Sequence, residues 1–485
     1  MANEQEFQER RWLALALLCV AQFVVVLDAS IVNVALPTIG RALEMSQGNL
    51  AWVVNAYVLT FGGFLLLGGR LADLLGRRRV FMSGLGLFAL ASLAGGFATS
   101  ESVLVAARAV QGLGAALLSP AALSIVTTIF RDGAERNKAL GAWGAVAGSG
   151  GAAGVLLGGI LTEYLGWEWI LWVNVPIGIG AALLAPRLIR ESVSESATRH
   201  FDFAGALSVT AGLSLLVYAL VEAPDAGWGS GRTIGLLALA AGLIGTFVAV
   251  ELRSAAPLVP FRIFRMRTLT GANVVGILTG ASLFSMFFFI SLYMQNVLGY
   301  SAIKAGISYL PLAGGVVIAA SVASQLVTRV GYKPVLVAGM GLLSAGLVWF
   351  TQISPGGSYA SDLLGPSLLV AVGLGFAFVP QTIAAVSGVE TREAGLASWL
   401  INTSQQIGGA LGLAVLSSIA FGTIEGLAPS GQVTPQILTE GYADAFAGGA
   451  GIGLLGLLAA LFLIRGRDSR AHMRIGAGEP VKAGV

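Results

Sequence analysis

Charged residues are scarce in this chain of 485 residues, at 11% of the total, whereas soluble domains usually contain about 25%. The chain also has only one cysteine, Cys19, and two histidines, His200 and His472. A lone thiol excludes a disulfide framework and a cysteine metal cluster, and the two histidines lie in polar segments, where they offer no relay or zinc site within a membrane. No G-x-x-x-x-G-K-[ST] segment is present, which excludes phosphate-loop ATP hydrolysis as an energy source.

Hydrophobic residues make up 56% of the chain, and the mean hydropathy is +0.82. They gather in fourteen runs, each about as long as a helix needs to cross the roughly 30 Å hydrocarbon core of a bilayer. The sequence therefore predicts an all-α polytopic membrane protein. The runs are Leu13–Leu36, Leu50–Gly68, Val80–Thr99, Val103–Ile129, Ala139–Thr162, Trp169–Ala185, Ala204–Val221, Thr233–Val250, Leu269–Met294, Ile303–Val327, Pro334–Gln352, Leu363–Val386, Leu396–Phe421 and Ala445–Ile464.

Lys and Arg residues fall almost entirely in alternate segments between these runs, as the positive-inside rule requires of cytoplasmic loops. The densest segment is Gly69–Arg79, GRLADLLGRRR. This asymmetry predicts a multi-pass protein of the cytoplasmic membrane with both termini on the cytoplasmic side. It also accounts for the net charge of +3 without a nucleic-acid partner.

Two parts of the chain repeat each other. Ser324–Leu336 aligns with Gly69–Phe81 without a gap, and two glycine motifs recur in the same order. Transporters are often built from such repeats, so we expect two six-helix bundles with two helices inserted between them. The expected segments are a cytoplasmic N-terminus 1–11, an N-terminal bundle 12–186, inserted helices with flanking loops 187–268, a C-terminal bundle 269–464 and a cytoplasmic tail 465–485.

This arrangement resembles the major facilitator superfamily, and several motifs are similar to those of its fourteen-spanner drug:proton antiporter branch. Leu27–Pro37, LDASIVNVALP, is similar to the helix-1 signature of that branch. The other matches are Gly69, Leu71, Asp73, Gly76, Arg77 and Arg78 with the loop 2–3 motif, Leu104, Arg108, Gln111, Gly112 and Gly114 with the helix-4 motif, and the glycines from Gly144 onward with the helix-5 antiporter motif, in which Val155 replaces the usual proline.

The resemblance implies a transporter rather than an enzyme, which exports hydrophobic or cationic drugs or antibiotics in exchange for protons by alternating access. It implies no metal and no cofactor, only the proton gradient, and a monomer in a bacterial inner membrane whose partners are a small-molecule substrate, protons and lipids. Export of an endogenous lipid or secondary metabolite is the alternative on the same fold. A membrane enzyme or a channel would show reactive side chains clustered at one depth or a repeated filter loop, and the sequence contains neither.

Three charged residues are candidates for proton coupling: Asp28, Arg108 and Glu222. Asp28 lies about 24 Å along its helix and Arg108 about 8 Å from the opposite end of its own, so both are expected at a similar depth. A cation beside a buried carboxylate favours its charged form, and withdrawal of the cation favours the protonated form. The resemblance also implicates Arg108 in proton transfer. The alternatives are purely structural roles for Asp28 and Arg108 and an interfacial position for Glu222.

The charged loop is the candidate gate. The resemblance implies that Asp73 and Arg77 form a cytoplasmic latch between the two bundles, and a topology anchor on lipid headgroups is the alternative. The second copy of the loop has Thr328 in place of Asp73 and Tyr332 in place of Arg77, which favours a gating role for the first copy. The candidate residues of the gate are Gly69, Asp73, Gly76, Arg77 and Arg78.

Glycines and amides complete the candidates. In the fifth apolar run glycines recur every three or four residues, so we expect one helix face of bare backbone that a neighbour can approach closely. The resemblance adds that this helix lines the interface across which the bundles rock; generic packing is the alternative. The glycines with this spacing are Gly144, Gly148, Gly151, Gly154 and Gly158, and Gly159 belongs to the same candidate motif. The alternatives to a cavity role are packing and capping for Asn33, lipid or core packing for Tyr57, and the joining of helices for the later amides. The candidate cavity residues are Asn33, Tyr57, Gln111, Asn402, Gln405 and Gln406.

Overall fold

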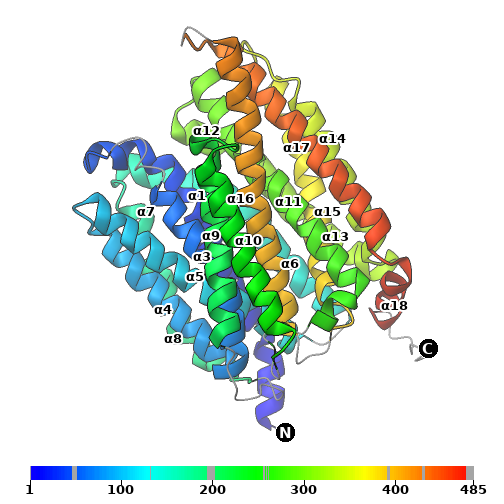
Figure 1. Ribbon diagram of the computed structural model, residues 1–485. Helices are drawn as coiled ribbons and strands as arrows, with labels where there is room; N and C mark the ends of the chain where they lie inside the picture. The colour runs from blue at the N-terminus through cyan, green and yellow to red at the C-terminus, as the bar shows by residue number, and fades with distance from the viewer. Residues whose placement is uncertain are drawn as a thin grey trace.

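The computed structural model is a bundle of long helices, with no strand among the residues that it describes (Figure 1). These are residues 2–45, 52–130, 133–193, 203–254, 257, 259, 261–389, 394–428 and 432–476. The predicted all-α class is therefore confirmed. The helices are α1 (Ala2–Ala42), α3 (Trp52–Leu75), α4 (Arg77–Gly96), α5 (Glu101–Ile129), α6 (Ala134–Tyr164), α7 (Trp169–Trp172), α8 (Asn174–Leu188), α9 (Phe203–Ala226), α10 (Gly231–Glu251), η1 (Phe261–Arg265), α11 (Arg267–Leu292), η2 (Tyr293–Val297), α12 (Ala302–Ser308), α13 (Leu310–Val330), α14 (Tyr332–Phe350), η3 (Tyr359–Leu363), α15 (Leu364–Val386), α16 (Ala394–Leu427), α17 (Pro435–Leu463) and α18 (Gly466–Gly476).

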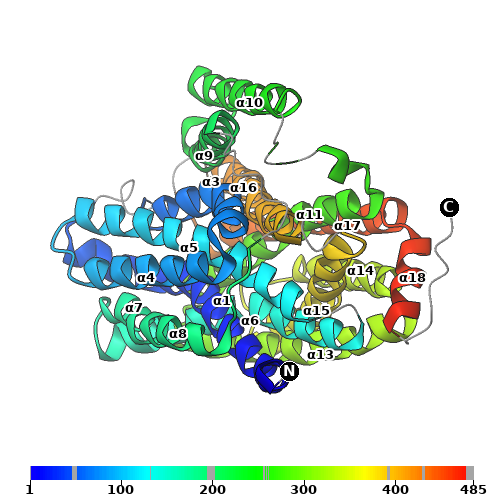
Figure 2. The ribbon, with the colours of Figure 1, turned by 90° about the horizontal axis from the view of Figure 1, so that it is seen from below.

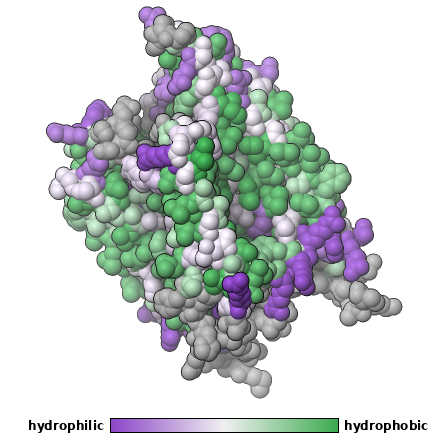
Figure 3. Space-filling view, viewed as in Figure 1, coloured by the Kyte–Doolittle hydropathy of each residue, from purple (hydrophilic) through white to green (hydrophobic). Residues whose placement is uncertain are grey.

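The apolar runs form helices because a helix satisfies every backbone polar group internally, as the hydrocarbon layer requires. By length and hydropathy, 11 of the described helices can span a membrane, or up to 13 if each of two bent pairs is one span. The apolar helix Ala204–Leu220 is shorter than this set. The predicted multi-span membrane protein is confirmed, and the count of fourteen stays a prediction. In Figure 3 a broad apolar surface covers the middle of the molecule, with polar residues toward its ends.

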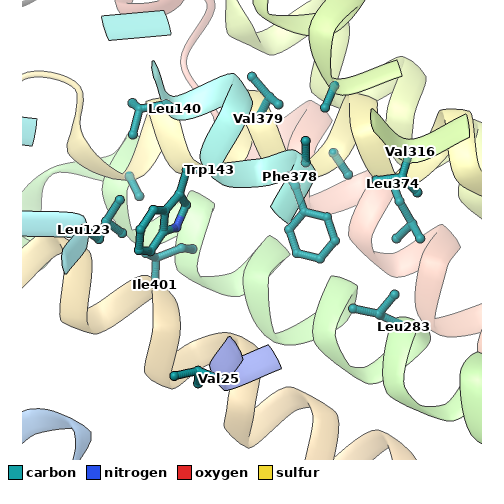
Figure 4. Close-up of a cluster of buried hydrophobic side chains, with 14 of the residues drawn as sticks. Val25, Leu123, Leu140, Trp143, Leu283, Val316, Leu374, Phe378, Val379 and Ile401 are labelled. Carbon is teal, nitrogen blue, oxygen red and sulfur yellow. The ribbon is translucent and has the colours of Figure 1, made fainter. Parts of the chain in front are cut away.

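The helices form two groups that meet face to face. In the first group α5 packs on α3 and α4, and α6 packs on α1; in the second, α16 packs on α11, and α15 packs on α13 and α14 (Figure 2). The groups meet where α6 contacts α13 and α15 and where α16 contacts α3 and α5. Buried apolar side chains from both groups join in one cluster there, including Val25, Trp143, Phe378 and Ile401 (Figure 4). The boundaries of the two bundles stay a prediction.

The inserted helices α9 and α10 lie on one side of the bundle (Figure 2). Helix α9 packs against α3 of the first group and α16 of the second, and α10 packs on α9. Ser230 caps α10 by accepting a hydrogen bond from the backbone N–H of Thr233 at 3.1 Å. In the turn between the two helices, Nε1 of Trp228 donates to Oγ of Ser418 on α16 at 2.6 Å. The inserted pair is therefore attached to both groups.

Helix α18 and the start of α1 lie at the same end of the bundle, which we call the terminal end (Figure 1). Here α3 turns into α4 and α13 turns into α14, each through one glycine with a positive φ angle: 108° at Gly76 and 85° at Gly331. Residues with a Cβ rarely adopt such angles, so both turns require glycine. The two loops that align in sequence thus share one backbone geometry.

Candidate functional site

A buried polar site, which we call the Asp28 site, is built from α1, α4 and α5 of the first group and from α8, which packs on α1 and α4 of that group. Asp28 lies on α1, Ser92 on α4, Arg108 and Gln111 on α5, and Asn174 at the start of α8. Arg108 and Gln111 are three residues apart, so both point from the same face of α5. All five residues are 1% exposed or less. The site is therefore closed to solvent in this conformation.

The carboxylate of Asp28 pairs with the guanidinium of Arg108. Nη1 of Arg108 lies 2.5 Å from Oδ2 of Asp28. A buried charge carries a desolvation penalty of several kcal/mol, which is offset only when an opposite charge and hydrogen bonds replace the lost water. The sequence placed these two residues at a similar depth, and the structure brings them into direct contact.

Two amides complete the surroundings of the carboxylate. Nε2 of Gln111 and Nδ2 of Asn174 each donate to Oδ1 of Asp28 at 2.7 Å. The same two nitrogens lie 2.6 and 3.2 Å from Oγ of Ser92, which connects the pair to α4. Three donors on two carboxylate oxygens replace hydrogen bonds to water that the buried carboxylate has lost.

Other groups hold Arg108 independently of Asp28. Nε of Arg108 donates to the carbonyl oxygen of Val53 at 3.0 Å, and Nη1 donates to Oε1 of Gln111 at 2.6 Å. The ring of Tyr57 packs on the guanidinium, with its centroid 4.5 Å from Cζ, which is a cation–π contact. Two polar atoms of the site, Nη2 of Arg108 and Oδ1 of Asn174, have no hydrogen-bond partner within the described ranges. The guanidinium would therefore keep partners if Asp28 became neutral.

Glycines of α6 set the position of the α1 segment that carries Asp28. A Cβ added at Gly154 would lie 2.7 Å from the carbonyl oxygen of Leu27, and one added at Gly158 would lie 2.7 Å from that of Ile31. Real Cβ atoms do not approach so closely, so bare backbone is required at both positions. The close contact of α6 with α1 thus fixes the backbone next to Asp28.

Other glycines of α6 face the second group. A Cβ at Gly144 would lie 3.1 Å from Val379 on α15, and one at Gly151 would lie 3.8 Å from Phe287 on α11. The glycines therefore face both α1 and the second group, whereas the sequence predicted one bare face. Gly159 is buried, and Gly148 lies outside the part of the structure described at the level of side chains. Helix α6 bends by 42° between Gly151 and Ala153, so the bend needs no proline at Val155.

Asp73 and Arg77 bond to each other across one helical turn. Nη2 and Nε of Arg77 lie 3.2 and 3.3 Å from Oδ1 of Asp73, and both side chains are buried. Nη1 of Arg77 donates to Oγ1 of Thr128 on α5 at 2.6 Å. These contacts lie within the first group, as does the buried Gly69. Residues 390–393, which precede α16 of the second group, lie outside the described part of the structure. A latch between the two groups therefore stays a prediction.

Glu191, which follows α8 and which the sequence analysis missed, holds the N-terminus of α4. Its Oε1 and Oε2 accept hydrogen bonds from the backbone N–H groups of Arg78 and Arg79 at 3.1 and 3.2 Å. Nη1 of Arg78 donates to the carbonyl oxygen of Ile189 at 3.2 Å. An anion at a helix N-terminus satisfies free N–H groups and complements the helix dipole. A Cβ at Gly76 would lie 2.5 Å from Oε1, so this glycine also makes room for the carboxylate.

The second turn repeats this arrangement with an uncharged acceptor. The backbone N–H of Lys333 donates to Oγ of Ser469 on α18 at 3.0 Å, and Nζ of Lys333 donates to the carbonyl oxygen of Leu461 at 2.7 Å. Lys333 aligns with Arg78 in the repeat, and Ser469 follows α17 as Glu191 follows α8. We call Glu191 and Ser469 the two turn caps, since each closes the turn of its own group.

The other predicted residues lie in different surroundings. Oε2 of Glu222 is 2.9 Å from Nη2 of Arg232 at the turn between α9 and α10, where Arg232 also bonds to the hydroxyl of Tyr218 at 2.8 Å. Tyr57 and Gln111, predicted to line the cavity, are buried at the Asp28 site. The amides of α16, which are Asn402, Gln405 and Gln406, are partly buried, and the side chain of Asn33 lies outside the described part.

Sequence reasoning missed Ser92 and Asn174 because each is a single small polar residue within an apolar run. The sequence offered only a general signal for them. A buried carboxylate such as Asp28 requires hydrogen-bond donors, and polar residues in other apolar runs are the candidates. Within the described ranges, no three His, Cys, Asp or Glu side chains gather where they could hold a metal ion.

A family model, two related proteins and a solved structure all match most of this chain. A family model described as the Major Facilitator Superfamily matches residues 18–413. The cephamycin export protein CmcT of Amycolatopsis lactamdurans is 43% identical over 443 residues, which cover 90% of this chain and 89% of that protein. The puromycin resistance protein pur8 of Streptomyces alboniger is 39% identical over 471 residues, which cover 95% of this chain and 93% of that protein. The crystal structure of the human organic anion transporter MFSD10 (TETRAN) shares the fold, with a TM-score of 0.66 at 15% identity over 93% of this chain and 99% of that chain.

Proposed function

Because this chain belongs to the major facilitator superfamily, whose members are transporters rather than enzymes, we propose that it is a proton-coupled exporter of antibiotic-like small molecules. The names of two relatives, a cephamycin export protein and a puromycin resistance protein, support the substrate class. The matches cover 90% and 95% of this chain, so the comparison concerns the whole transporter rather than one part of it.

The observation that carries proton coupling is the ion pair of Asp28 and Arg108 inside the first group, with both side chains 1% exposed or less. An ionisable residue within a membrane span is expensive to keep, and such residues mark ion pathways by default. Here the acid is the only carboxylate in the Asp28 site, so one protonation event changes the charge of the whole site.

Protonation of Asp28 cancels its charge and frees Arg108 from the pair. The guanidinium retains the carbonyl oxygen of Val53, the side-chain oxygen of Gln111 and the ring of Tyr57, so it can move without becoming an isolated buried charge. The protonated carboxyl needs an acceptor for its new O–H group. Asn174 can supply one by turning its amide, because its Oδ1 has no partner within the described part of the chain. Proton binding thus rearranges the contacts that join α1, α5 and α8.

The bias of basic residues supports a cytoplasmic location for the terminal end in a bacterial inner membrane. A proton then reaches Asp28 from the outer side and leaves toward the cytoplasm, while the substrate moves outward by alternating access of the two groups. The proton gradient is the energy source, and no cofactor takes part. Asp73 and Arg77 act as the latch at the terminal end, and Glu222 is a second candidate for proton exchange near the outer surface.

Inverted membrane vesicles test this function. Vesicles that contain the protein receive an acidic interior, with the membrane potential clamped by potassium and valinomycin, and uptake of puromycin and of tetraphenylphosphonium is measured. We expect both probes to accumulate and to be released when nigericin collapses the pH gradient. Uptake no greater than in vesicles without the protein, for both probes, contradicts the proposed function.

A further inference from the structure

A buried amide of the second group has no hydrogen-bond partner among the described residues. Gln381 on α15 is 0% exposed, and neither its Nε2 nor its Oε1 is within hydrogen-bonding reach of a partner in the described structure. A buried amide that makes no hydrogen bond loses its interactions with water without compensation. Such a residue destabilises the conformation described here, and a partner that binds in another conformation would account for its presence.

The polar side chains near Gln381 form hydrogen bonds that do not include its amide. Oγ of Ser404 on α16 donates to Oδ1 of Asn273 on α11 at 2.9 Å, and Nδ2 of Asn273 donates to the carbonyl oxygen of Leu269 at 2.9 Å. Gly276 lies next to the amide, since a Cβ added there would be 2.7 Å from Nε2 of Gln381. The absent side chain at Gly276 provides the space in which the amide sits. An amide used to join helices would instead take part in this network.

The amide lies beside the apolar cluster between the two groups. A Cβ added at Gly276 would also lie 3.0 Å from Cδ1 of Ile401, so Ile401 and the Gln381 amide are adjacent. Phe378 precedes Gln381 by three residues on α15 and therefore shares its side of the helix. Figure 4 shows Ile401 and Phe378 in the cluster with Trp143 of α6, which belongs to the first group. The cluster combines one unpaired amide with apolar and aromatic side chains from both groups.

We propose that Gln381 is the polar recognition group of a substrate subsite that accepts compounds carrying an amide or lactam, with the Trp143, Phe378 and Ile401 side chains as apolar walls. An amide side chain presents a donor and an acceptor side by side, and the complementary arrangement is another amide. Pockets of this kind are mostly apolar with few polar groups, and those few set the selectivity. The inference deepens the proposed function and rests on it. Since the amide is fully buried here, substrate reaches it when the groups move apart.

The first test measures the stability of the ligand-free protein in detergent. Replacing an unpaired buried amide with an apolar side chain of similar size removes an uncompensated polar group, so Gln381→Leu is expected to raise the midpoint of thermal unfolding. The control is Thr382→Val on the same helix, which removes a polar group that has a partner. Oγ1 of Thr382 donates to the carbonyl oxygen of Phe378 at 2.8 Å, so the loss of this hydroxyl is not expected to raise the midpoint. A midpoint lowered by Gln381→Leu would mean that the amide has a structural partner, and the proposal would be overturned.

The second test measures binding in detergent, without a proton gradient. Puromycin carries an amide, and tetraphenylphosphonium has no hydrogen-bonding group. We expect Gln381→Leu to raise the Kd for puromycin about 10-fold and to leave the Kd for tetraphenylphosphonium within about 2-fold, since the lost interaction is one or two hydrogen bonds. Gly276→Ala, which displaces the amide, should repeat this selectivity. Equal changes for both probes, no change for either, or no puromycin binding by the parent protein overturns the proposal. Failure of the proposed function differs, because it appears as absent gradient-driven uptake in vesicles.

Discussion

Nη1 of Arg108 lies 2.5 Å from Oδ2 of Asp28, and both side chains are 1% exposed or less. Such a pair is a weak source of net stability, because the attraction between the charges is spent on their desolvation. The proposed transport cycle, in which the pair opens, gives a reason to keep the pair despite this desolvation penalty. Nη2 of Arg108 and Oδ1 of Asn174, which have no partner among the described residues, can take new partners when the pair opens.

Arg108→Lys is expected to reduce gradient-driven transport about 10-fold or more, because lysine cannot reproduce a planar fork with several fixed donors. The guanidinium now contacts Asp28, Gln111 and Val53 at once, and an ammonium on a flexible chain cannot reach all three. Uptake by inverted vesicles measures the effect. Lys304, whose ammonium contacts the ring of Tyr300, is the control position: Lys304→Arg should leave transport unchanged. Parental transport by Arg108→Lys would show that the fork geometry is not required.

Asn174→Leu removes one of the two amide donors to Oδ1 of Asp28. A charged group that loses a hydrogen bond in a buried site costs about 1–3 kcal/mol. We therefore expect a rate of proton-driven uptake roughly 10-fold lower, while the affinity for tetraphenylphosphonium in detergent stays at the parental value. Equal losses of rate and of affinity would place Asn174 in substrate binding instead.

The two turn caps predict matched losses of stability. Glu191→Gln removes the anion from the N-terminus of α4, and Ser469→Ala removes the acceptor for the N–H of Lys333 at the start of α14. Each change is expected to cost about 1 kcal/mol, which lowers the unfolding midpoint measured in detergent. Glu440→Gln is the control, since Glu440 bonds to Gln436 on an exposed turn of α17. If neither cap variant unfolds earlier than Glu440→Gln, the caps do not hold their turns.

Gly154→Ala is expected to impair both folding and transport. Its Cβ would lie 2.7 Å from the carbonyl oxygen of Leu27, so α1 and α6 have to separate, and such overpacking costs about 1–3 kcal/mol. Gly86→Ala on α4 is the matched control, because an added Cβ there meets nothing within 4 Å. Yield of folded protein and vesicle uptake should fall for Gly154→Ala and persist for Gly86→Ala. Normal uptake by Gly154→Ala would show that α6 does not fix the position of Asp28.

The sequence predicted the helical membrane fold because long apolar runs leave no other way to satisfy the backbone in lipid. It also predicted a similar depth for Asp28 and Arg108, because depth follows from the rise per residue. The alignment of Gly76 with Gly331 predicted two equivalent turns, and their φ angles of 108° and 85° agree.

Other features depend on which helices become neighbours, and distance along a helix does not reveal that. Gln111, expected in the cavity, bonds to Asp28 because α5 presents it on the face of Arg108 toward α1. Asn174 reaches the same carboxylate from α8, and Glu191 reaches the start of α4 from a loop far along the chain. The single glycine face expected for α6 divides between Gly154 and Gly144, because α6 has α1 on one side and α15 on the other.

The most direct test of the account is Asp28→Asn in inverted vesicles. An amide of nearly the same size cannot exchange a proton at neutral pH, so the variant should bind tetraphenylphosphonium and exchange it across the membrane without a gradient. We expect the variant to accumulate none of it when an acidic interior is imposed, whereas the parent protein accumulates it. Asp444→Asn, at an acid that bonds to Thr423 on the exposed surface, is the control and should behave as the parent. Parental, gradient-driven accumulation by Asp28→Asn would contradict the central claim that proton binding at Asp28 drives transport.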